Sequence, residues 1–89
     1  MNKQIHELFD SEIIAGSLGA RRVRLDFNPS EKEEVHRIKM AGALLINQIA
    51  DFAGDIRMHH RAIERVEEAV MWGVKSATME PLAGPRRPT

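Results

Sequence analysis

The sequence predicts an all-α protein: an antiparallel hairpin of two long helices, preceded by a short N-terminal helix and an extended arm, and assembled as a homo-oligomer. Three Phe and one Trp leave the core to Ile, Leu, Val, Met and Ala, a mixture that favours helices. Apolar residues recur at helical spacing over two long segments. The stretch "AVMWGV" at 69–74 is apolar on every side of its helix, and such a helix is normally buried all round. In 89 residues, packing against other copies explains this better than the alternative, a compact three-helix monomer.

The composition excludes several classes of protein. The absence of cysteine excludes disulfides and thiolate metal sites and permits a reducing compartment. A net charge of zero does not suggest a protein that binds duplex nucleic acid. Apolar stretches fall far short of the roughly 20 residues that cross a bilayer, and no signal peptide is visible. We therefore expect a soluble intracellular protein that does not enter a membrane.

The N-terminal segment, residues 1–26, is predicted to hold a short helix over 3–15, which ends near Gly16. Its apolar stripe consists of Ile5, Leu8, Phe9 and Ile13. The following "RRVRLDF" at 21–27 alternates charged and apolar residues, so we expect an extended arm that lies on a helix or on another subunit.

The first long helix is predicted over about 31–53. Pro29 biases Asn28 away from helical backbone, and Ser30 with Glu33 has the spacing of a capping box. Apolar residues then repeat at two heptad positions, and we expect them to face the second helix: Val35, Gly42 and Ile49, and Ile38, Leu45 and Phe52. "AGD" at 53–55 supplies the turn.

The second long helix is predicted over about 56–79, before Pro81. Its seam is Ile63, Val66, Val70 and Gly73, beside a stripe of small residues formed by Ala62, Ala69, Ser76 and Ala77. Residues 27–79 thus form the helical hairpin domain. The remaining residues, 80–89, contain too much Pro and Gly for regular structure and are expected to be a flexible tail.

No catalytic motif is visible, so we do not expect an enzyme. His60 and Glu64 lie one turn apart and could ligate a metal, although a solvated helix face is the more common explanation, and we predict no metal or cofactor. "HRIK" at 36–39 has the donors of an anion site, or is an exposed face on which Arg37 pairs with a nearby glutamate.

Three segments together resemble the hairpin domain of the phage anti-CBASS and anti-Thoeris sponges. They are "FNPS" at 27–30, "VHRIK" at 35–39 and "IERVEEAVMWGVKSAT" at 63–78. The second helix places Glu67, Glu68, Ala69, Met71, Trp72 and Lys75 at matching positions, with Gly73 where Ala is usual. The resemblance covers about 27–79.

The resemblance implies a helical, non-catalytic oligomer, typically a hexamer, that acts in the cytoplasm of an infected bacterial host. Such proteins sequester cyclic di- or trinucleotide messengers in pockets between protomers, and thereby block CBASS signalling. Anti-Thoeris relatives instead bind cyclic ADP-ribose isomers. A non-catalytic scaffold or protein-interaction module is the alternative from another class.

The candidate ligand-binding residues follow from this resemblance and from their chemistry. Arg37 and Lys39 are the expected phosphate donors, with Lys39 in the "RIK" stretch of the family. Phe27 is expected either to stack on a base or to staple the start of the helix, and Asn28 and Ser30 could read a base edge or a phosphate nearby. A second site between protomers could use His60, Arg61 and Lys75, whereas Trp72 is expected in the core.

Overall fold

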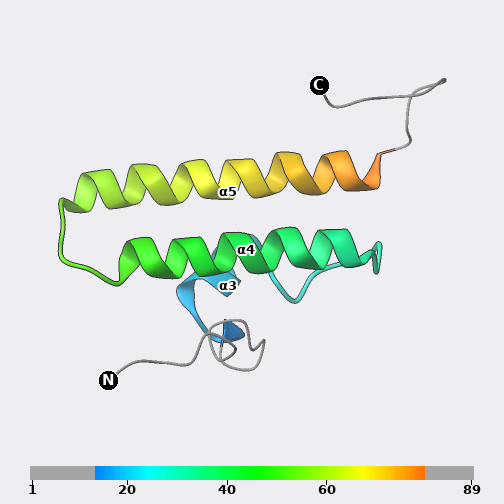
Figure 1. Cartoon of the computed structure of the whole chain (residues 1–89), viewed down its shortest axis with the longest axis horizontal. Helices are drawn as coiled ribbons and strands as arrows, with labels where there is room; N and C mark the ends of the chain where they lie inside the picture. The colour runs from blue at the N-terminus through cyan, green and yellow to red at the C-terminus, as the bar shows by residue number, and fades with distance from the viewer. Residues whose placement is uncertain (1–13, 80–89) are drawn as a thin grey trace.

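The computed structural model describes residues 14–79, which form three α-helices and no strand. Helix α3 spans Leu18–Val23, α4 spans Glu33–Ala50 and α5 spans Ile56–Thr78. Helices α4 and α5 run side by side in opposite directions, and α3 lies against α4 (Figure 1). The predicted all-α hairpin is therefore confirmed. The helix predicted over 3–15, except its last two residues, and the tail predicted over 80–89 lie outside the described residues. No helix between residues 14 and 79 is long and apolar enough to span a bilayer.

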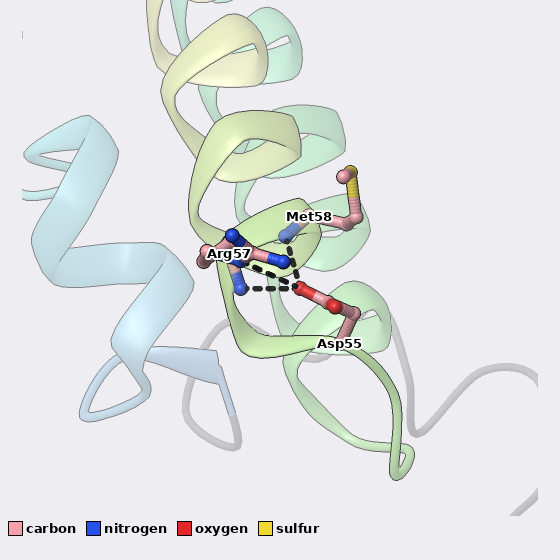
Figure 2. Close-up of polar contacts among 3 residues, drawn as sticks. All are labelled: Asp55, Arg57 and Met58. Carbon is pink, nitrogen blue, oxygen red and sulfur yellow. Dashed lines mark hydrogen bonds and ion pairs between the residues drawn. The ribbon is translucent and has the colours of Figure 1, made fainter.

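The turn of the hairpin ends at Asp55, which caps the start of α5. One oxygen of its carboxylate, Oδ1, accepts hydrogen bonds from the backbone N–H groups of Arg57 at 2.9 Å and Met58 at 3.2 Å (Figure 2). A negative charge is also favourable at the positive end of the helix dipole. Asp55 was not predicted as a cap, and the first long helix ends at Ala50 rather than near 53.

Replacing Asp55 with alanine is expected to lower the free energy of unfolding by about 1 kcal/mol, because two N–H groups lose their acceptor. Asp55→Asn keeps an oxygen in the same place and should remain close to the unaltered protein. Urea unfolding followed by circular dichroism measures both variants. Equal losses in the two would assign the effect to charge rather than to capping.

The start of α4 differs from the predicted capping box. The N-cap is Lys32, without a side-chain cap, and the helix begins at Glu33. Glu31 adopts the left-handed conformation with φ 59°, which interrupts helical backbone ahead of Lys32. Ser30 instead belongs to the preceding loop, where its hydroxyl accepts from the Lys32 N–H at 3.2 Å and donates to Asn28 Oδ1 at 2.7 Å.

The extended arm predicted at 21–27 is wrong: residues 21–23 complete helix α3, and residues 24–26 form a turn. The hydroxyl of Ser17 caps this helix by accepting from the Ala20 N–H at 3.2 Å. Arg24 ends the helix in the left-handed conformation, with φ 56°. Packing selects helix over strand here, because a helix buries Gly19, Ala20 and Val23 together.

The core lies where α4 is enclosed between α3 and α5. Its buried apolar side chains come from all three helices and from the segment before α3. They are Ile14, Ala20, Val23, Val35, Ala43, Ile46, Ile63 and Val70. Ile63 and Val70 confirm the predicted seam of α5. Leu45 and Phe52 were predicted in the seam of α4, but they are 49% and 60% exposed. The buried face of α4 is rotated away from Leu45 because it must also accept α3, whereas Phe52 lies beyond the end of α4.

Candidate ligand-binding site

The connection between α3 and α4 presents an exposed aromatic ring with two cations close to it. The Phe27 side chain is exposed, and the guanidinium carbon of Arg24 lies 5.0 Å from the ring centroid. The ammonium of Lys39, on the second turn of α4, lies 5.6 Å from the same centroid. An exposed aromatic face with adjacent cations is suited to a ligand that carries both a base and a negative charge.

Lys39 is buried, with 7% of its surface exposed, and its ammonium is held by the backbone. It donates to the carbonyl oxygen of Arg24 at 2.9 Å and to the carbonyl oxygen of Phe27. Burial lowers the pKa of Lys39, the Arg24 guanidinium lowers it further, and Asp26 opposes both effects. The side chain thus joins the helix α4 to both ends of the turn that carries Phe27.

An open hollow of about 260 Å³ lies next to Lys39 and is lined by residues from all three helices. Its lining combines charged groups with an apolar floor: Arg22, Val23, Arg24, Lys39, Glu67, Val70, Met71 and Val74. Arg22 Nη1 lies 3.1 Å from Glu67 Oε2, which links α3 to α5 across the hollow. The lining holds more cations than carboxylates, so this pocket is electrostatically suited to an anionic ligand.

A second groove of about 420 Å³ runs between α4 and α5 and receives no residue from α3. Its walls are almost wholly apolar: Ile38, Ala41, Gly42, Leu45, Arg65, Val66, Ala69 and Val70. Beyond this groove, Met71 and Trp72 are each 54% exposed, and the ammonium of Lys75 lies 5.2 Å from the Trp72 ring. The prediction that Trp72 lies in the core is therefore wrong for a single chain.

The predicted site residues fall into separate groups. Phe27, Asn28, Ser30 and Lys39 gather around the α3–α4 connection, although Asn28 Nδ2 donates to the Lys32 carbonyl at 3.0 Å. Arg37 is exposed on α4, and Lys75 is exposed near the end of α5. His60 and Arg61 are exposed near the start of α5. This start lies next to the turn of the hairpin, whereas the α3–α4 connection leads into the other end of α4 (Figure 1).

Arg22 and Arg24 line the pocket but were not assigned to it from the sequence. The run "RRVR" was the available signal, but its interpretation as an arm concealed the position of the two guanidinium groups. The possible metal pair of His60 and Glu64 is a separate matter. Residues 14–79 contain no cluster of three His, Asp or Glu side chains that could hold a metal ion, so this pair has no third ligand among them.

Comparison with known families places the chain in a family of ligand-binding proteins. The model of the Acb2/Tad1 hairpin domain matches residues 20–78, which include most of α3 and both long helices. The chain belongs to this family of anti-CBASS and anti-Thoeris sponges, whose general role is to bind cyclic nucleotides rather than to catalyse a reaction. The resemblance found in the sequence is thus confirmed, and it begins several residues earlier than predicted. No curated protein and no solved structure matched the chain.

Proposed function

We propose that this protein binds cyclic di- or trinucleotide messengers and holds them unchanged, so that CBASS-type signalling fails in the cytoplasm of an infected bacterium. The observation that carries the proposal is the exposed Phe27 ring beside Arg24 and Lys39, at the edge of a pocket lined by cations. The role requires no catalysis.

The chemistry of the connection matches the parts of such a ligand. A base stacks on Phe27, because every base offers a π-face. Guanidinium groups bind phosphate through paired N–H donors, and Arg24 is exposed beside the ring. Arg22 supports the same pocket while paired with Glu67. The apolar floor formed by Val70, Met71 and Val74 contacts the sugar and base edges.

We propose that the complete site forms between protomers. The hollow of one chain is about 260 Å³, whereas pockets for small molecules span roughly 300–1,000 Å³. The predicted residues Arg37, His60, Arg61 and Lys75 are exposed and do not line this hollow, so a ligand that also contacts them is one held between two copies of the chain. The apolar groove and the exposed Trp72 supply a surface for the assembly, which by family resemblance is a hexamer.

A second candidate function is that of an oligomeric scaffold that docks other proteins. The apolar groove between α4 and α5 favours it, because monomeric proteins rarely expose large contiguous apolar patches. A scaffold makes no use of the cations around Phe27, and this difference separates the two functions.

Titration calorimetry tests the proposal. The panel contains cyclic di-AMP, cyclic tri-AMP, a cyclic ADP-ribose isomer and a linear adenylate dinucleotide, and bound ligand is recovered after heat denaturation. We expect one cyclic di- or trinucleotide to bind tightly and to be released unchanged. Binding of the cyclic ADP-ribose isomer alone would assign the protein to Thoeris signalling. No heat with any compound, from a folded oligomer, would favour the scaffold.

Phe27→Ala is expected to lower the affinity for the compound that binds by roughly 5- to 150-fold, because base stacking contributes about 1–3 kcal/mol per base. Phe52→Ala is the matched control, since Phe52 is also an exposed phenylalanine but lies at the turn of the hairpin. Calorimetry of both variants with the same compound measures the difference. Equal weakening by the two substitutions would contradict a stacking role for Phe27.

A further inference from the structure

We propose that Lys39 is a positioning residue rather than a phosphate ligand: it holds the turn from Arg24 to Phe27 so that the ring and the Arg24 guanidinium face the messenger. The identity of the messenger rests on the proposed function, whereas the role of Lys39 in the turn rests on the geometry of the chain itself. It changes the expected role of Lys39, because the phosphate donor becomes Arg24.

The hydrogen bonds of Lys39 close the turn. The carbonyl oxygen of Arg24 accepts from the Phe27 N–H at 3.0 Å and from Lys39 Nζ at 2.9 Å. The carbonyl oxygen of Phe27 accepts from the same ammonium. Both ends of the turn are therefore attached to one atom on α4. Without Lys39, this segment keeps the backbone bonds of the Arg24, Leu25 and Phe27 N–H groups, and each of these joins it to α3 or to itself rather than to α4.

The position of the ammonium also limits its use as a ligand contact. Lysine has three donors, and two of them are directed at carbonyl oxygens. The side chain is buried, and the Phe27 ring lies beside its charged end. Arg24, by contrast, is exposed, and within residues 14–79 no carboxylate pairs with its guanidinium. A phosphate therefore meets Arg24 more readily than Lys39.

The turn can be observed without any ligand. The chain contains three phenylalanines, so ¹³C-labelled phenylalanine gives few ring signals to assign. We expect Lys39→Met to shift and broaden the Phe27 signal and to speed exchange of the Phe27 amide at least tenfold, while Phe52 is unchanged. Lys39→Arg, which retains donors, should restore both. Lys32→Met is the matched control, because Lys32 Nζ donates to the Ala77 carbonyl at 2.9 Å on the exposed surface.

Binding of cyclic di-AMP and cyclic tri-AMP to the same variants completes the test. The inference predicts that Lys39→Met loses the turn and at least tenfold in affinity together, with helical content kept, and that Lys39→Arg recovers both. An undisturbed Phe27 signal in Lys39→Met overturns the inference, and lost binding with that signal intact makes Lys39 a direct ligand. If the unaltered protein binds neither compound, that result counts against the proposed function, and the Phe27 signal and amide exchange alone decide the role of Lys39 in the turn.

Discussion

Replacing Gly19 with alanine is expected to lower the free energy of unfolding by about 3 kcal/mol, the upper end of the usual cost of overpacking a core. An added Cβ would collide with the carbonyl oxygen of Ala43, and it would lie 2.7 Å from the carbonyl carbon and 2.8 Å from Cα of that residue. These are backbone atoms of α4, so no side-chain rotation relieves the collision. Helix α3 must move away, which also breaks the 2.7 Å bond from the Gly19 N–H to Asn47 Oδ1.

Gly16→Ala is the matched control for this prediction. A Cβ at Gly16 meets no described atom within 4 Å, so the same chemical change should alter stability little. Urea unfolding followed by circular dichroism compares the two variants. Alanine also favours helices over glycine by about 1 kcal/mol, and this gain offsets part of the cost of the collision. A Gly19→Ala protein as stable as the unaltered one would therefore mean that the collision costs no more than this gain, and that α3 does not pack against α4 this closely.

The long helices could be predicted from the sequence because their apolar residues repeat over many turns. Val70 and Ile63 follow the helical period of α5, and burial confirms them. The period of α4 was harder to use, since this helix contacts α3 as well as α5 and its buried face includes Lys39. A two-helix interpretation therefore assigned Leu45 to the seam, although it is 49% exposed in the folded chain.

Helix α3 and the pocket could not be predicted, because both depend on contacts between distant segments. A six-residue helix has too few apolar positions to show a period. Its cap is supported by Asn47, whose side-chain amide donates to the Ser17 hydroxyl at 2.9 Å from another helix. Once α3 forms, Arg22 reaches Glu67 on α5. Phe27 was chosen as a candidate from its residue type and the family resemblance, but the hydrogen bonds of Lys39 to two carbonyl oxygens leave no trace in the sequence.

Leu45→Glu is expected to dissociate the proposed assembly into chains of 10.1 kDa, as measured by size-exclusion chromatography with light scattering. Leu45 lines the apolar groove between α4 and α5, where Ala41 and Ala69 allow a second helix to approach closely. A carboxylate buried in this almost wholly apolar groove costs several kcal/mol, and pairing with Arg65, the one charged residue of the lining, offsets only part of that cost. At about 3 kcal/mol per contact the dissociation constant rises more than 100-fold, and a closed ring repeats the loss at every interface.

The folded chain itself should tolerate Leu45→Glu, because the side chain is already half exposed within one copy. Phe52→Glu is the matched control: it places the same charge at an exposed apolar residue outside the groove. If Phe52→Glu dissociates the assembly and Leu45→Glu does not, the contact lies at the turn of the hairpin instead. The monomeric variant also tests the site, since a pocket completed across the interface must lose cyclic di-AMP or cyclic tri-AMP on dissociation. Undiminished binding by a monomer would place the whole site on one chain, and the exposed apolar residues at 69–74 would then serve assembly alone.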